Sequence, residues 1–116
     1  MIAVTGLNKS FGKKNVLKNI TFSANPGQIT GLIGPNGSGK TTFMRIASTV
    51  MGYDSGTVEI DGFVVNSKNA REIREKIGVL FGGDSTLYGN LTARENIMYF
   101  GRLYGMNKCY EIVRVC

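Results

Sequence analysis

Residues Gly34 to Thr41 have the types and the spacing that bind phosphate. The segment reads GPNGSGKT and matches the pattern G-x-x-x-x-G-K-[ST]. In a loop of this kind, closely spaced backbone N–H groups converge on an anion at the start of a helix. Gly37 and Gly39 permit the required backbone angles and leave no side chain in the way of the phosphate. An ordinary glycine-rich turn is the alternative interpretation.

Two side chains of this loop add chemistry of their own. The ammonium group of Lys40 is expected to reach the β- and γ-phosphates of a nucleotide as a point charge. The hydroxyl group of Thr41 is expected to ligate Mg²⁺, which bridges the same phosphates and neutralises their charge. The pattern therefore predicts a nucleoside triphosphate and Mg²⁺ as ligands, with Thr41 as the metal ligand.

Composition excludes several other chemistries. The chain has no histidine, so it contains no imidazole base, no His-ligated metal and no His-dependent triad. Its two cysteines, Cys109 and Cys116, would be separated by a rise of ~10 Å on a helix, which exceeds the ~7 Å limit for a disulfide. They are expected to be reduced thiols in a cytosolic protein, with a two-cysteine metal site as the alternative. No catalytic residue is assigned.

Charge is distributed unevenly along the chain. Lys and Arg total 14 against 8 Asp and Glu, for a net charge of +6. No acidic residue precedes Asp54, so all of the excess positive charge lies in the first half. This asymmetry favours a polyanionic ligand such as a nucleotide, a nucleic acid or an anionic lipid, and solvated lysines on loops are the alternative.

The elements that must position the loop alternate between β-like and helical stretches. Strands are expected at residues 2–7, 16–22, 29–33, 57–60, 63–65 and 79–81, with turns at Asn25-Pro26-Gly27 and Asp61-Gly62. Helices are expected at residues 41–51 and 70–76, from the capping box Thr92–Glu95 to Gly105, and at residues 109–116. The longest apolar run, Ile97 to Phe100, has four residues and no signal-peptide pattern precedes it, so we expect a soluble chain.

Four segments together resemble the ATP-binding subunits of ABC transporters, particularly the sodium-export-like branch. They are residues 7–12 (LNKSFG), 34–42 (GPNGSGKTT), 55–62 (SGTVEIDG) and 87–96 (LYGNLTAREN). The resemblance implies an α/β fold, a P-loop NTPase core with an N-terminal antiparallel β subdomain. It also implies that residues 1–116 are the N-terminal part of an ATP-binding domain, truncated before the signature and Walker B motifs.

The resemblance places Phe11 at the position of the aromatic residue that stacks on adenine, where the family usually has Tyr. A ring can stack on a base without reading its hydrogen-bonding edge, so purine discrimination should be modest. The alternative for Phe11 is a position in the core. For Val16 the resemblance implies packing against the nucleotide, and the alternative is an ordinary core position on a strand. The predicted nucleotide-binding residues are Phe11, Gly34, Pro35, Asn36, Gly37, Ser38, Gly39, Lys40, Thr41 and Thr42.

The sequence departs from the family pattern in two places. Gly82 and Gly83 stand where the family commonly has a Gln that links Mg²⁺ and the attacking water to the transmembrane partner, and Asp84 is either a substitute or an ordinary loop acid. The chain also ends at Cys116, before the signature motif, the Walker B acids and the switch histidine. We therefore expect weak nucleotide binding, little turnover and exposed apolar surface at residues 29–33 and 79–81.

The function implied by the resemblance is ATP binding in the nucleotide-binding subunit of an ABC transporter, which couples ATP hydrolysis to export. Its implied partners are a transmembrane permease subunit and a second ATP-binding subunit, at the cytoplasmic face of the cell membrane and without nucleic acid. The alternative is a non-hydrolysing fragment that only binds nucleotide or a partner subunit. Another P-loop enzyme, such as a small kinase or GTPase, and a nucleic-acid binder stay open as further alternatives.

Overall fold

The computed structural model describes residues 1–80, 82 and 87–106. These residues fall into two compact units, Met1–Gly78 and the part of Val79–Cys116 that is described. The expected helix at 109–116, both cysteines, Gly83 and Asp84 lie outside the described residues. In the part of the chain that is described, no helix is long and apolar enough to cross a membrane.

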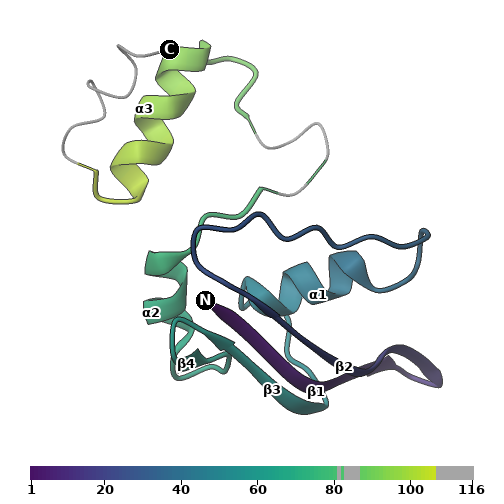
Figure 1. Cartoon of the computed structure of the whole chain (residues 1–116). Helices are drawn as coiled ribbons and strands as arrows, with labels where there is room; N and C mark the ends of the chain where they lie inside the picture. Colours follow the sequence, from purple (N-terminus) through teal and green to yellow (C-terminus); the bar gives the residue numbers. More distant parts are fainter. Residues whose placement is uncertain (81, 83–86, 107–116) are drawn as a thin grey trace. The chain divides into compact units, whose positions relative to one another are not determined.

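The first unit is built on a four-stranded antiparallel sheet with the order β2-β1-β3-β4 (Figure 1). Its strands are β1 (Ile2–Phe11), β2 (Lys14–Ala24), β3 (Ser55–Ile60) and β4 (Phe63–Val64). The first two extend beyond the predicted limits because they pair along their whole length, with bulges that include one between Val4 and Leu7. The predicted turn at Asp61-Gly62 is confirmed, since both residues have positive φ (48° and 81°) as a tight hairpin requires.

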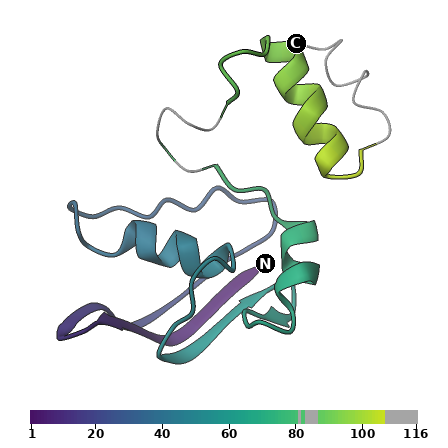
Figure 2. The same cartoon turned by 180° about the vertical axis from the view of Figure 1, so that it is seen from behind.

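Two helices complete the first unit, α1 (Lys40–Ala47) and α2 (Ala70–Lys76). Figures 1 and 2 show α1 along one face of the sheet. Phe43 and Ile46 point from α1 into the core, and the Phe43 ring meets that of Phe22 on β2 edge to face at 5.1 Å. The buried core side chains are Val4, Leu7, Leu17, Phe43, Ile46, Ala47, Val58, Ile60, Val65 and Ile73.

The prediction that the first helix extends to Met51 is wrong, because α1 ends at Ala47. Thr49 has a φ of 62° and its N–H donates to the carbonyl of Ile46, while Val50 donates to Arg45. These two bonds form a Schellman motif, in which a left-handed residue terminates the helix. Arg74 of α2 holds Thr49 in this conformation by donating to its hydroxyl oxygen at 2.6 Å and to its carbonyl at 3.2 Å.

The strand predicted at residues 29–33 is also not formed. This segment is a coil that runs past α1, and the side chains of Ile29 and Ile33 are fully exposed (Figures 1 and 2). An isolated strand cannot satisfy its backbone groups, and no described strand lies beside this segment to pair with it. Val79 and Leu80 of the predicted strand at 79–81 are likewise not in a strand, and Leu80 is 81% exposed, whereas Phe81 lies outside the described residues. The predicted exposure of apolar surface is confirmed for Ile29, Ile33 and Leu80.

The described part of the second unit consists of α3 (Ala93–Leu103) and the turns before it. The predicted capping box is confirmed: Thr92 accepts from the N–H of Glu95, whose carboxylate accepts from the N–H of Thr92 at 2.8 Å. Asn96 is buried and binds the preceding turn through bonds to the backbone of Tyr88, Leu91 and Thr92. Gly105 ends the helix at a φ of 72°, as predicted.

The tight contact between β3 and β1 predicts a strong effect of Gly56→Ala. A β-carbon at Gly56 would lie 2.4 Å from the carbonyl oxygen of Gly6 and 2.7 Å from the α-carbon of Leu7, at a φ of 95°. These neighbours are backbone atoms and cannot move aside, so we expect a loss of about 3 kcal/mol or more in the free energy of unfolding.

Gly62→Ala is the matched control for this prediction. Gly62 also has a positive φ, 81°, but its β-carbon would meet no atom within 4 Å. Gly62→Ala should therefore lower the free energy of unfolding by only about 1 kcal/mol, the cost of the backbone strain. Urea unfolding followed by circular dichroism measures both variants, and equal losses would contradict the assignment of a steric clash to Gly56.

Candidate nucleotide-binding site

The candidate phosphate-binding loop leads directly into α1. Gly39, the residue before the helix, has a φ of 97°. A β-carbon there would lie 2.5 Å from Leu17 Cδ2 and 3.2 Å from the carbonyl oxygen of Val16. Because both the backbone angle and the space exclude other residues, glycine is required where the loop touches the start of β2.

Three of the predicted nucleotide-binding residues contact the side chain of Lys40. Its ammonium group donates to the carbonyl oxygens of Gly34 and Pro35, the latter at 2.7 Å, and to the hydroxyl of Ser38 at 3.4 Å. The loop is closed by a bond from the N–H of Ser38 to the carbonyl of Pro35 at 3.2 Å. The loop thus curves around the ammonium group and fixes its position at the start of α1.

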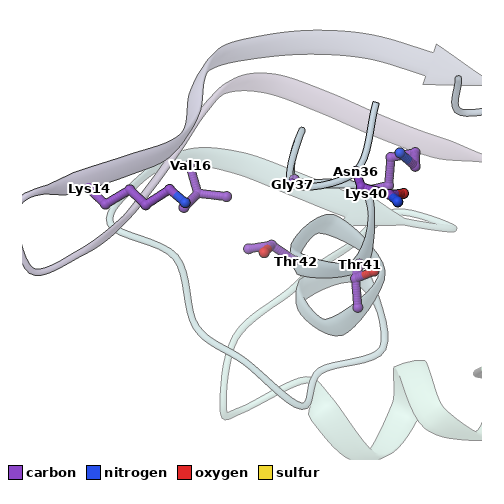
Figure 3. Close-up of a pocket in the computed structure, with 8 residues that line it drawn as sticks. Lys14, Val16, Asn36, Gly37, Lys40, Thr41 and Thr42 are labelled. Atoms are coloured by element: carbon purple, nitrogen blue, oxygen red, sulfur yellow. The ribbon is translucent and has the colours of Figure 1, made fainter. Parts of the chain in front are cut away.

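A pocket of about 260 Å³ lies between this loop and the start of β2 (Figure 3). Six of its lining residues are among the predicted nucleotide-binding residues. The complete lining consists of Lys14, Val16, Asn36, Gly37, Gly39, Lys40, Thr41 and Thr42. Two of these are cations and none is an acid, so the pocket has an electrostatic preference for an anion.

The backbone of α1 adds to this preference. In the part of the chain that the structure describes, the N–H groups of Lys40, Thr41 and Thr42 donate to no backbone carbonyl. The first turn of the helix also carries no acidic residue. Unpaired N–H groups and the positive end of the helix dipole attract phosphate, which is the chemistry predicted for this loop.

Phe11 lies at the end of β1 and is not among the residues that line the pocket. Its side chain is 47% exposed, so the alternative of a core position is wrong. The ammonium group of Lys9 lies 5.3 Å from the centre of the Phe11 ring, within the range of a cation–π interaction. Stacking of Phe11 on adenine stays a prediction, and the exposed ring is available for it.

Asp54, the first acidic residue of the chain, fixes the end of β1. Its carboxylate accepts from the N–H of Ser10 at 2.6 Å and from Lys9 at 3.5 Å. The hydrogen bond from Ser10, followed by the charge of Lys9, lowers the pKa of Asp54 below its usual value of 3.8. The same carboxylate therefore holds both the strand end and the cation beside Phe11.

One residue that lines the pocket, Thr41, has the chemistry of an Mg²⁺ ligand. Thr41 lines the pocket from the first turn of α1, and its hydroxyl oxygen is a hard ligand of the kind that Mg²⁺ prefers. Among the described residues, no group of three or more His, Cys, Asp or Glu side chains forms a metal cage. Mg²⁺ keeps several waters and is usually held by few protein ligands together with substrate phosphates, so a single hydroxyl in the pocket is chemically suitable for it.

The glycine-rich turn, the cationic pocket and the helix start define a P-loop of the class that binds nucleotide phosphates. The family model described as "ABC transporter" matches residues 17–114. The chain belongs to this family, and it corresponds to the N-terminal part of the ATP-binding cassette. The predicted fold class, a P-loop core with an antiparallel β subdomain, is confirmed by the structural matches below.

Among the relatives, the ABC transporter ATP-binding protein NatA of Bacillus subtilis is 40% identical over 112 residues, which are 93% of this chain and 45% of NatA. The linearmycin resistance ATP-binding protein LnrL of the same organism is 38% identical over 106 residues, which are 91% of this chain and 33% of LnrL. The chain thus spans between a third and about half of the length of these relatives.

Solved structures give the same result. The ATP-binding subunit of an ABC transporter matches with a TM-score of 0.79 and 26% identity, over 93% of this chain and 44% of that one. The cassette MJ0796, in a dimeric post-hydrolysis state bound to ADP and Pi, matches with a TM-score of 0.68 and 30% identity, over 84% of this chain and 45% of that one.

The bonds of Asp54 predict a pH dependence of stability. Because its pKa is lowered in the folded chain, the stabilisation is complete above the ordinary value near 3.8 and is lost as the pH falls below 3.8 through the lowered value. We expect the wild type to lose its stability advantage over Asp54→Asn across this acidic range. Urea unfolding between pH 6 and about pH 2.5 measures the difference.

Glu72→Gln is the control for this experiment, since Glu72 lies exposed on α2 and makes no bond to another described residue. The difference in the free energy of unfolding between Glu72→Gln and the wild type should not change in the same way below pH 3.8. Titration of the Asp54 carboxyl carbon by NMR tests the cause directly. A value of 3.8 or above in the folded chain would disprove the role assigned to Ser10 and Lys9.

Proposed function

We propose that this chain binds ATP together with Mg²⁺ as the nucleotide-binding part of an ABC transporter subunit. The single observation that carries the proposal is the pocket at the start of α1, which has two lysines, no acid and unpaired N–H groups. Lys40 and the loop amides hold the β- and γ-phosphates, and Thr42 lines the same pocket. Phe11 provides the face on which adenine stacks.

In this proposal, bound Mg²⁺ neutralises phosphate charge and orients the phosphate chain. The protein contributes Thr41 as the ligand, and Lys40 leaves the carbonyls of Gly34 and Pro35 for the phosphates. The loop amides need no such exchange, because among the described residues the N–H groups of Lys40, Thr41 and Thr42 donate to no backbone carbonyl. These amides are thus preorganised for a nucleotide tail.

Hydrolysis and transport are the finer part of the proposal. MJ0796 was solved as a dimer with ADP and Pi, and several relatives carry transport or export in their names. We propose that the subunit acts likewise with a second ATP-binding subunit and a membrane permease, at the cytoplasmic face of the membrane. The exposed apolar side chains of Leu87, Leu103 and Tyr104 in the second unit support contact with a partner.

One observation favours a second candidate function, nucleotide binding without hydrolysis. Phosphoryl transfer to water needs a group that orients the water, and none of the residues that line the pocket is an acid or a histidine. Phosphate release, measured with Mg²⁺ and an excess of ATP over the chain, separates the two functions. Sustained turnover favours the hydrolytic function, and binding alone favours the second candidate.

Lys40→Ala tests the proposal as a whole. Loss of the ammonium group removes the cation at the start of α1, and we expect the affinity for ATP with Mg²⁺ to fall by about 100-fold or more. Lys68→Ala is the control, because Lys68 is exposed and is not among the residues that line the pocket, and it should change the affinity less than about twofold. Isothermal titration calorimetry measures both variants.

Unchanged affinity in Lys40→Ala would refute the proposal, and a marked preference for GTP would favour a different P-loop enzyme.

Thr41→Ala tests the metal ligand. We expect the gain in ATP affinity on adding Mg²⁺ to shrink by about tenfold, because the hydroxyl ligand is lost while the loop amides remain. Thr42→Ala is the matched variant from the same helical turn and should leave that gain unchanged. The measurement compares ATP affinity with Mg²⁺ and with EDTA for each chain. A gain in Thr41→Ala as large as in the wild type would contradict the assignment.

A further inference from the structure

A second lysine, Lys14, lines the pocket from β2, whereas Lys40 lines it from α1. Lys14 is the first residue of β2 and lines the pocket together with Val16. Figure 3 shows its extended side chain running alongside Val16, with the nitrogen at the end nearer to α1. Lys14 and Lys40 therefore border one pocket from β2 and from α1.

The two lysines differ in what they bind. The ammonium group of Lys40 donates to two carbonyl oxygens and one hydroxyl of the loop. Lys14 is exposed, and within the described residues its ammonium group has neither an acidic partner nor a hydrogen-bond acceptor. Its charge is therefore not neutralised by any described residue and is available to an anion in the pocket.

The fold fixes where Lys14 stands. It pairs with Phe11 across the hairpin, and two residues further on the side chain of Val16 approaches the loop, with its Cγ1 atom 3.4 Å from the position of a β-carbon at Gly39. Side chains two residues apart on a strand share a face, so Lys14 and Val16 look the same way. The contact at Gly39 thus places the Lys14 side chain on the loop side of the strand.

We infer that the ammonium group of Lys14 is a second cationic ligand of the phosphate chain of the bound nucleotide. This inference rests on the proposed function and adds a binding residue to the same site. A polyphosphate chain has several charged oxygens, of which Lys40 and the loop amides engage only some. A cation on the facing strand strengthens binding of the chain and is independent of the base and the sugar.

The experiment compares Lys14→Gln with Lys13→Gln in the full chain. Lys13 is the adjacent exposed lysine in the hairpin turn, and it does not line the pocket. Displacement of a fluorescent ATP analogue measures the affinity for ATP and for inorganic tripolyphosphate, which has the phosphate chain but no base or sugar. We expect Lys14→Gln to weaken both ligands by about three- to tenfold, Lys14→Arg to restore both, and Lys13→Gln to change neither by more than about twofold.

The possible outcomes separate this inference from the proposed function. If Lys40→Ala abolishes ATP binding while Lys14→Gln behaves like Lys13→Gln, the proposed function stands and the inference is overturned. If Lys14→Gln weakens ATP but not tripolyphosphate, Lys14 contacts the base or the sugar and the inference is again overturned. If the folded wild-type chain binds no nucleotide, both are overturned. Thermal unfolding of each variant verifies that the exposed substitutions leave the fold unchanged.

Discussion

The close approach of Gly39 to the start of β2 is the contact on which the site depends. The loop that follows Pro35 can meet the sheet only where the chain has no β-carbon, because Leu17 and the carbonyl of Val16 occupy that space. At the same residue the chain turns into α1, whose Phe43 and Ile46 are buried in the core. The core thereby holds the helix, and the helix holds its unpaired N–H groups and Lys40 at the mouth of the pocket.

In the first unit, the acidic residues Asp54 and Asp61 lie at strand ends, whereas the charged residues that line the pocket are lysines. No acid precedes Asp54 in the sequence. Asp54 accepts from the N–H of Ser10 and pairs with Lys9, both on β1. Asp61, in the turn after β3, pairs with the N-terminal amine. Both carboxylates have a lowered pKa because of these bonds. The acids thus secure strand ends, and the pocket lining retains only positive charge.

The elements that the sequence predicts correctly have their determinants within a few residues of one another. Asp61-Gly62 requires two positive φ angles, and Thr92 with Glu95 satisfies the N–H groups of a helix start, so each signal is local. The end of α1 carries no such signal, because Thr49 takes the left-handed position that glycine usually occupies and Arg74 from another element stabilises it. The segment at residues 29–33 is apolar enough for a strand, but strand formation depends on a neighbouring strand, which no local pattern reveals.

The same distinction explains which site residues the sequence could provide. Asn36, Gly37, Gly39, Lys40, Thr41 and Thr42 line one pocket, because one continuous motif contains them all. Lys14 lies more than twenty residues earlier and reaches the pocket only through the hairpin register and the contact of β2 with Gly39. The sequence offers one signal for Lys14: it lies two residues before Val16, so both side chains are on the same face of the strand. This signal indicates the pocket only when the position of Val16 beside the loop is known. A pocket residue supplied by a facing strand is therefore a property of the tertiary structure, whereas the sequence of the loop itself contains the phosphate-binding pattern.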